Sequence, residues 1–302
     1  MLLQVADTSI YSLTNIRSNV LVENPRVEKG INSVFGLATL GYDNFLYLDV
    51  TGRNDVSSTL PTANNSYFYP SASFSAVISE KLNLSTNSPL SFLKARVAYA
   101  EVGSDTDPYL LNNYYTPEAL FGPNSAFGVN SLAGNTDLRS ERTTSFEVGL
   151  DVRFLNNRLR LDATYYSMLS KDQIILLPVA TTSGRNTRLT NAGEISNKGI
   201  EVALSATPIS SQNGLNWDIT LNLGHNRAIV ESLPEGIEDN YPMVANMFPN
   251  DGGTSGLDLV AVEGELLGQL RGLTFVRDEN NNIVHEDGLP LTSEEKSTVG
   301  SY

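Results

Sequence analysis

Polar and apolar residues alternate along eight separate segments of this chain, and no other feature of the sequence limits the fold as strongly. In residues 45–55, for example, Leu46, Leu48 and Val50 are separated by single Tyr47 and Asp49 residues. Successive side chains of a strand point to opposite faces of its sheet, so each segment predicts a strand with one apolar and one polar face. The predicted strands occupy residues 31–40, 45–55, 68–78, 93–99, 145–154, 160–165, 200–206 and 217–223.

The length of these segments points to a membrane. Several approach the ~9–11 residues with which a tilted strand crosses a bilayer, whereas strands of globular proteins centre on ~5–6. Charged residues make up only 18% of the chain, and no run approaches the ~18 consecutive apolar residues of a transmembrane helix. Long amphipathic strands are typical of a membrane-spanning β-barrel, and we expect their apolar faces to share its convex, lipid-facing side.

The connections between the predicted strands alternate between short and long. Short links cover residues 41–44, 79–91, 155–158 and 207–216, and long ones cover residues 56–67, 103–142, 170–198 and the chain from 225 onward. Outer-membrane barrels have tight turns at one end and long loops at the other, whereas Greek-key sandwiches have no reason to keep that order. We therefore predict an all-β fold, an antiparallel transmembrane barrel segment over residues 1–230, followed in residues 231–302 by an extracellular loop region with a hairpin at 275–284.

Charge and cysteine content exclude several classes of function. A formal net charge of −14 opposes binding to the phosphate backbone of nucleic acids. Cysteine is absent, which removes disulfides, thiolate metal sites and cysteine nucleophiles. The first residues, MLLQVAD, lack the basic start and long apolar run of a secretory signal.

Five longer strings carry a family resemblance. They are GRNDVSSTLP (52–61), SYFYPSASFSAVISE (66–80), DLRSERTTSFEVGLDVRFLNNRLRLDATYY (137–166), NAGEISNKGIEV (191–202) and VEGELLGQLRGLTFVRDENNN (262–282). In this order they resemble the SusC/RagA family of TonB-linked outer-membrane transporters. Val56 stands where that family usually has a tryptophan, so a contact made by that ring is not expected here.

The resemblance implies a fold and a function. It implies part of a barrel of about 22 strands, whose wide lumen must be gated by a plug. It also implies location in the outer membrane among its lipids, import of glycans or oligopeptides under a SusD-like lipoprotein, and energy from the TonB complex, without a cofactor. The chain would then be an internal stretch of the barrel that lacks the plug and the TonB-binding segment, and we expect it neither to close a barrel nor to transport by itself.

Two groups of residues are candidates for ligand contact. Arg53, Asn54 and Asp55 end a predicted strand on the long-link side, where they could meet cargo or form hydrogen bonds that hold the barrel rim. The aromatic candidates could stack on sugar rings or pack within loops and interface girdles. They are Tyr67, Tyr69, Tyr109, Tyr114 and Tyr115, with Phe68 beside the first two.

The remaining reactive residues indicate no catalytic or metal site. His225 and His285 are the only histidines and lie far from any pair of further ligands. Asp278 begins a segment that resembles a calcium loop, but Ile283 replaces the required glycine, which favours a hairpin turn. Carboxylates such as Glu147 and Asp151, or Glu141, have no spacing that marks a glycosidase pair. A soluble carbohydrate-binding β protein and a glycoside hydrolase remain the alternatives to a transporter.

Overall fold

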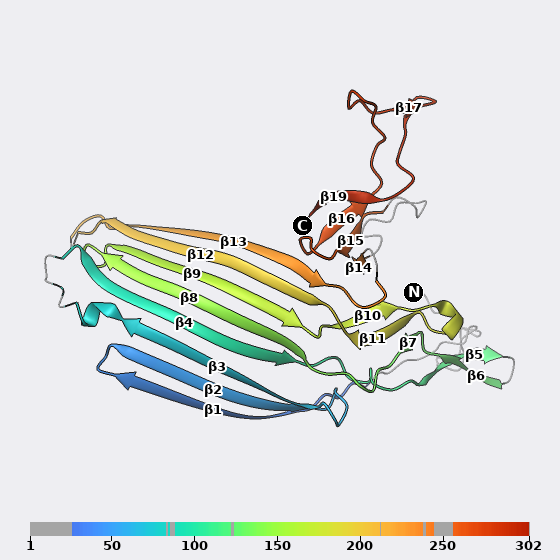
Figure 1. The fold of residues 1–302 in the computed structure, drawn as a ribbon, viewed down its shortest axis with the longest axis horizontal. Coiled ribbons are helices and arrows are strands. Elements are labelled where there is room, and N and C mark those ends of the chain that lie inside the picture. Colours follow the sequence, from blue (N-terminus) through green and yellow to red (C-terminus); the bar gives the residue numbers. More distant parts are fainter. Residues whose placement is uncertain are drawn as a thin grey trace, which may run out of the picture.

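Eight long antiparallel strands form one sheet in the computed structural model, which describes residues 26–82, 84, 88–121, 124–211, 213–237, 240–244 and 256–301. The N-terminal residues 1–7 lie outside this part. Each long strand pairs with the next long strand along the chain, so the sheet is a meander (Figure 1). Its strands, in order, are β1 (Ile31–Tyr42), β2 (Leu46–Ser57), β3 (Ser66–Val77), β4 (Leu90–Ser104), β8 (Glu141–Phe154), β9 (Leu159–Lys171), β12 (Glu194–Ile209) and β13 (Trp217–Ser232).

The eight predicted strands are confirmed, and most extend further than the alternation indicated. β13 is a clear example, since it continues to Ser232 although its regular alternation ends near Leu223. The extra residues lie on the side of the long links, where the strands rise beyond the apolar segment and have no lipid to select for apolar side chains. The sequence pattern therefore marks the membrane-crossing part of each strand rather than the whole strand.

The links fall at the two opposite ends of the strands. We call these two ends of the sheet the short-link edge and the long-link edge. β1–β2, β3–β4, β8–β9 and β12–β13 are joined at the short-link edge, and the other connections lie at the long-link edge (Figure 1). This arrangement confirms the predicted topology. The lengths do not alternate strictly, however, because residues 58–65 on the long-link edge form a shorter link than residues 78–89 on the short-link edge.

Two of the short links are tight turns built on left-handed backbone. Asp43 and Asn44 have φ of 55° and 51°, and Phe45 N donates to Tyr42 O at 3.0 Å. Asn156 and Asn157 repeat the geometry with φ of 54° and 66°. Positive φ at both central residues is typical of the type I′ turn, whose twist matches that of the paired strands. Among residues other than glycine, Asn and Asp tolerate a positive φ best.

The register places most apolar residues of the eight long strands on one face, although Phe35 and Leu37 of β1 lie opposite Arg53 and Thr51 on the other. Across β2, β3 and β4, for example, Leu48 pairs with Phe74, and Phe74 pairs with Val97. Val97 in turn pairs with Val148 of β8, so the same face continues. We call this the apolar face, and the opposite side, which carries Asp49, Thr51 and Arg53, the polar face. A shared apolar face is confirmed, while its place on the convex side of a closed barrel stays a prediction.

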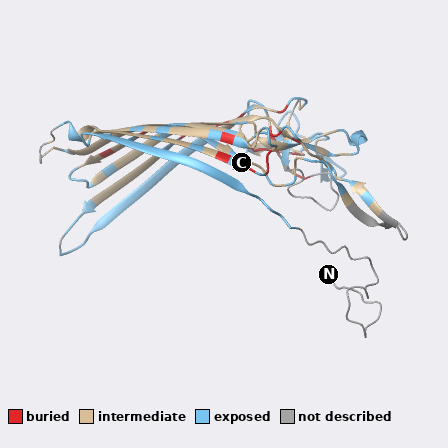
Figure 2. Cartoon of the chain, turned by 90° about the horizontal axis from the view of Figure 1, so that it is seen from below, coloured by how far each residue is buried: buried red, intermediate tan, exposed pale blue. Residues whose placement is uncertain are grey.

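The apolar face is exposed rather than buried. Val34 is 77% exposed, Val148 45% and Leu221 49%, and Figure 2 shows the sheet as a single layer without a second sheet against it. A soluble sandwich would bury these side chains between two sheets. A continuous apolar face of this size needs a hydrocarbon environment, so the sandwich alternative is wrong for this fold.

The polar face is held by hydrogen bonds and ion pairs between strands. Thr51 and Ser71 hydroxyls lie 2.5 Å apart. Arg96 of β4 reaches over β8 to Asp162 of β9, with its two terminal nitrogens 2.9 and 2.7 Å from the carboxylate oxygens. Gly149 of β8 makes this possible, because a Cβ there would collide with the Arg96 guanidinium. These contacts suit a surface that faces water.

The long links contain short strands that the alternation did not predict. β5 (Tyr115–Phe121) pairs with β6 (Asn124–Val129), and β7 (Leu132–Ala133), β10 (Ile174–Pro178) and β11 (Thr187–Asn191) form a small sheet. A further sheet contains β14 (Tyr241–Val244), β15 (Asp258–Ala261), β16 (Gln269–Gly272) and β19 (Ser297–Ser301), and β17 (His285–Glu286) pairs with β18 (Leu289–Pro290). The described residues also form two 3-10 helices, η1 (Ile78–Glu80) and η2 (Thr181–Ser183).

The predicted hairpin at 275–284 is present. Val284 N donates to Val276 O at 2.9 Å, and Asp278 N donates to Asn282 O at 2.9 Å. Hydrogen bonds from the Asn282 backbone and side chain lower the pKa of Asp278, whose carboxylate caps the turn. Among the described residues, no helix has both the length and the apolar character to span a bilayer.

A charge placed on the apolar face should destabilise the barrel, whereas the same charge one residue further along should not. We expect Leu221→Arg to lower the free energy of unfolding by about 2–4 kcal/mol, the cost of an arginine near the bilayer midplane. Asn222→Arg is the matched control, because Asn222 lies on the polar face. Urea unfolding of the full-length barrel in lipid vesicles measures both, and equal losses would contradict the assignment of faces.

Candidate functional site

A polar cluster lies on the polar face near the long-link edge, and strand geometry brings its members together. Arg53 and Asp55 lie on the same face of β2 because they are two residues apart, and the register places Tyr69 and Tyr67 of β3 opposite them. Ser33 of β1 lies opposite Asp55 on the other side. Three neighbouring strands thus contribute to one site.

The Asp55 carboxylate is the centre of this cluster. Arg53 Nε donates to Asp55 Oδ1 at 2.8 Å, and the Tyr69 hydroxyl donates to Oδ2 at 2.6 Å. A terminal nitrogen of Arg53 also donates to Ser33 Oγ at 2.9 Å. Asp55 is only 5% exposed, so its charge depends on these donors, since a buried carboxylate without them would be costly.

Two tyrosines close the space beside the carboxylate. The rings of Tyr67 and Tyr69 stack with centroids 6.1 Å apart and planes inclined by 20°. Tyr67 is 8% exposed and belongs to a small core with Leu60, Leu138 and Leu189. This core joins the link 58–65 to the links on either side of β8 and β9, so the ring of Tyr67 has a packing role.

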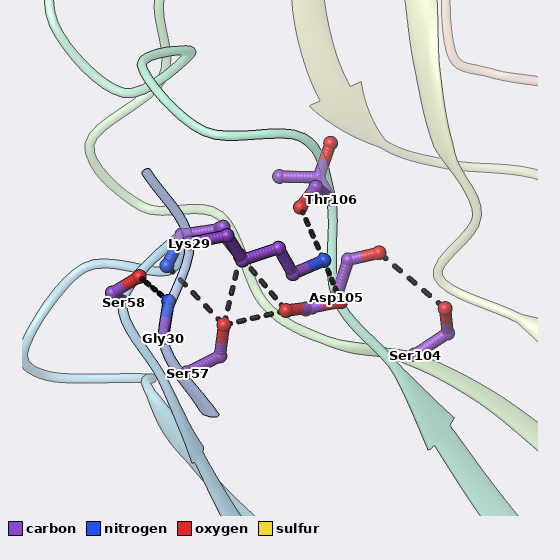
Figure 3. A network of polar contacts seen from close by, with 8 residues as sticks. Lys29, Gly30, Ser57, Ser58, Ser104, Asp105 and Thr106 are labelled. Atoms are coloured by element: carbon purple, nitrogen blue, oxygen red, sulfur yellow. Dashed lines mark hydrogen bonds and ion pairs between the residues drawn. The ribbon is translucent and has the colours of Figure 1, made fainter. Parts of the chain in front are cut away.

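A second network ties the links together around Asp105, which follows β4 (Figure 3). Lys29 Nζ donates to Asp105 Oδ1 at 2.8 Å. The Ser57 and Thr59 hydroxyls donate to Oδ2 at 2.5 and 3.1 Å. Both hydroxyl residues are only 1% exposed. Beside this network, Gly30 N donates to Ser58 Oγ at 2.9 Å and anchors the start of β1.

Burial and hydrogen bonding act on Asp105 in opposite directions. Burial would raise the pKa of Asp105, but hydrogen bonds from Lys29, Ser57 and Thr59 outweigh it and leave that pKa below its ordinary value. The carboxylate is therefore ionised at neutral pH. The alternate residues Arg53, Asp55, Ser57 and Thr59 follow one another along the chain, with Arg53 and Asp55 in the first network and Ser57 and Thr59 in the second.

The structure separates the candidate residues into three groups. Arg53, Asp55, Tyr67 and Tyr69 form the cluster just described. Asn54 lies on the opposite face, because alternation turns it away, and its amide donates to Ser66 Oγ at 3.0 Å. The other tyrosines lie in the long link before β8, and they are Tyr109, Tyr114 and Tyr115, exposed by 57%, 49% and 72%.

The exposed tyrosines are differently anchored. The Tyr109 hydroxyl accepts a hydrogen bond from Glu28 N at 3.1 Å, and its backbone is left-handed with φ of 66°. Tyr115 begins β5 and pairs with Val129. Rings of this kind offer a flat apolar surface with a polar hydroxyl, which suits sugars and peptide side chains.

The described residues include no group of three or more His, Cys, Asp or Glu side chains that could hold a metal ion. Asp151 is paired with Arg153, whose terminal nitrogen donates to it at 2.9 Å.

The main interactions at the site are hydrogen bonds, ion pairs and aromatic packing. Together with the exposed apolar face and the long links at one edge, they define the class of protein as an outer-membrane β-barrel.

This chain belongs to the TonB dependent receptor-like, beta-barrel family, whose profile matches residues 5–282. Proteins of this family are outer-membrane β-barrels, which places the chain in that membrane. The expected resemblance to the SusC/RagA type is confirmed by the relatives that follow.

The chain is 27% identical to TonB-dependent receptor P3 of Formosa agariphila, over 76% of this chain and 23% of the relative. It is also 27% identical to TonB-dependent receptor SusC of Bacteroides thetaiotaomicron, over 69% of this chain and 22% of the relative. It thus spans only about a quarter of the length of these relatives. The structure of the RagAB peptide transporter shares the fold, with a TM-score of 0.74 and 24% identity over 97% of this chain and 32% of that chain.

The close approach of Tyr67 to Gly103 can be tested by substitution. A Cβ on Gly103 would lie 2.5 Å from Tyr67 Cδ2, so we expect Gly103→Ala to displace the ring and cost about 1–3 kcal/mol of unfolding free energy. Gly36→Ala is the matched control, because nothing lies within 4 Å of its added Cβ. Urea midpoints of the two variants should differ, and a Gly103→Ala variant as stable as the control would refute the packing.

The Asp105 network should stabilise the links only while its carboxylate is charged. Because the folded-state pKa is lowered, the stabilisation is present above the unfolded value of about 3.9 and is lost as pH falls through the folded-state value. We expect Asp105→Asn to lower the thermal midpoint at pH 7, and the difference from wild type to shrink below pH ~4. The exposed neighbour Asp107 supplies the control Asp107→Asn, and a gap independent of pH would contradict the role of the charge.

Proposed function

We propose that this chain forms part of the wall of a TonB-dependent outer-membrane transporter that imports glycans or oligopeptides. The observation that carries the proposal is the two-sided sheet, with an exposed apolar face, a hydrogen-bonded polar face and bulky links at one edge. A barrel with this wall presents a polar lumen and a loop-rich opening. The similarity to SusC and to the fold of the RagAB peptide transporter supports the transport role.

Import through such a barrel needs parts that the described sheet does not supply. β1 and β13 are the first and last strands of the sheet, and each has one side without a pairing strand in the described chain, apart from residues 228–230 of β13, which bond to residues 264–267. Open edges are not tolerated in lipid, so the segment works as part of a closed barrel. We propose that the complete transporter pairs with a SusD-like surface lipoprotein and receives energy through the TonB complex.

Within this function, the candidate residues take two roles. We assign Arg53, Asp55 and Tyr67 to bracing the barrel rim, because Asp55 and Tyr67 are buried and Arg53 is bonded to two partners. The exposed tyrosines of the long link are the better cargo contacts. They are Tyr109, Tyr114 and Tyr115. Tyr69 of β3 is half-buried and donates to Asp55, so we assign it to the bracing cluster as well.

A whole-cell uptake assay tests both the proposed transport and the assignment of the exposed tyrosines to cargo contact. Cells that carry the full-length transporter and its lipoprotein are given a labelled oligosaccharide mixture or a labelled oligopeptide mixture. We expect uptake of one of the two, a several-fold reduction on Tyr109→Ala, Tyr114→Ala and Tyr115→Ala combined, and loss of uptake when TonB is deleted.

Phe127→Ala provides a matched control, because Phe127 is an exposed aromatic residue of the neighbouring strand β6 outside the proposed set. Equal uptake by the triple variant and wild type would remove the tyrosines from the cargo site. Uptake that persists without TonB, or is absent with every cargo, would contradict the proposed function itself.

A further inference from the structure

The pairing between β3 and β4 stops before either strand ends. Val77 N donates to the O atom of Phe45, the residue directly before β2. The backbone N–H groups of odd-numbered β3 residues therefore point to β2, and those of even-numbered residues point to β4. Pro70 should donate to β4 but has no N–H. The ladder accordingly ends at Ser71 and Ala100, and β3 and β4 separate toward the long-link edge.

A groove of about 530 Å³ lies at this separation. Phe68, Pro70 and Arg142 line it and belong to the apolar face by register. Asn64, from the link before β3, lines the same groove. The groove is therefore on the lipid-facing side of the wall, where the apolar face ends toward the long-link edge.

The walls of the groove are fixed by hydrogen bonds. The Asn64 amide donates to Asp137 O and Leu138 O at 3.3 and 3.2 Å, which joins the link before β3 to the link before β8. Arg139 is held through its backbone, since Asn191 Oδ1 accepts from Arg139 N at 2.8 Å and Asn191 Nδ2 donates to Arg139 O at 2.8 Å. The Arg139 side chain remains 61% exposed.

The groove is lined by two arginines, Arg139 and Arg142, and by one carboxylate, Glu101, so its lining carries a net positive charge. Arg142 is 50% exposed and forms an ion pair with Glu101, in which the nitrogen and oxygen lie 3.1 Å apart. Arg139 pairs with Asp172 at 3.1 Å, and Asp172 is not part of the groove. Both arginines keep free donors, because a guanidinium has five N–H groups and each of these pairs uses one nitrogen.

We propose that this groove binds the phosphate group of an anionic membrane lipid. Arginine binds phosphate through paired hydrogen bonds, and the hydroxyl of Ser140 adds a donor at the same place. The apolar face continues directly below the groove, with Phe68 55%, Tyr99 42% and Phe146 43% exposed. A lipid seated here would place its headgroup against the arginines and its acyl chains along these rings.

The position of the groove favours a lipid over a soluble cargo. Cargo enters through the lumen, on the polar face, whereas Arg142 and Phe68 lie on the opposite face of the same strands. The inference therefore concerns the surroundings of the barrel and does not depend on which cargo it carries.

Lipid titration of the full-length protein tests the proposal. Native mass spectrometry in detergent measures the first binding step of phosphatidylglycerol, with zwitterionic phosphatidylcholine as the reference lipid. We expect Arg139→Gln with Arg142→Gln to weaken phosphatidylglycerol binding by roughly 5-fold for each arginine, the factor that corresponds to about 1 kcal/mol per basic residue at an anionic lipid surface. Arg158→Gln with Arg160→Gln removes the same charge at the short-link edge and should leave this step unchanged.

Glu101→Gln distinguishes binding from a structural role. Removing the carboxylate frees Arg142 for phosphate, so this variant should bind phosphatidylglycerol more tightly than wild type, although it has lost an ion pair. Arg142→Lys should fall between wild type and Arg142→Gln, and it keeps the test valid if the glutamine variants fold poorly. Unchanged binding in all arginine variants, or weaker binding in Glu101→Gln, would overturn the proposal.

A competition arm identifies the source of the phosphate. Inorganic phosphate at millimolar concentration should not displace the lipid, because it lacks the acyl chains that contact the rings below the groove. Displacement at that concentration would mean a general anion site and would overturn the assignment to lipid.

Discussion

Every backbone hydrogen bond within a bilayer must be formed by the protein itself, and this constraint governs the whole sheet. Water is absent there, so the six inner strands of the large sheet, β2, β3, β4, β8, β9 and β12, each pair on both sides. Pairing fixes the register, and the register decides which face each side chain takes. A slip of one residue would turn Leu48 and Val97 to the lumen and Asp49 to the lipid. The alternation of the sequence and the continuous ladder are therefore two aspects of one requirement.

Beyond the bilayer the links obey different rules, because water competes for every polar group. They build a small core around Leu60, Leu138 and Leu189, and they bury polar groups only where partners are at hand. Asp55 and Asp105 show this clearly, since each carboxylate accepts hydrogen bonds from two or more side chains. The rim of the sheet is thus held by hydrogen bonds and ion pairs, while the tyrosines that we propose as cargo contacts are exposed.

The sequence predicts the regular part of this molecule well, because period-2 alternation follows directly from strand geometry. The same rule turns Asn54 to the opposite face from Arg53 and Asp55, so these three consecutive polar residues do not share one contact surface. The Asp105 network has no comparable signal. Lys29 and Asp105 are 76 residues apart, and their contact depends on how two links fold over the edge of the sheet. The short strands of the links are equally hidden, since they follow tertiary packing rather than a repeating environment.

The tight turns at the short-link edge also bear on how the wall is assembled. Asp43 with Asn44, and Asn156 with Asn157, bend the chain back within two residues, so the strands that they join are neighbours in sequence as well as in space. Contacts between such strands are local and form in microseconds, far faster than the pairing of distant segments. The register of each of these hairpins can therefore form before distant segments pair, and the order of the long strands along the chain is also their order in the sheet.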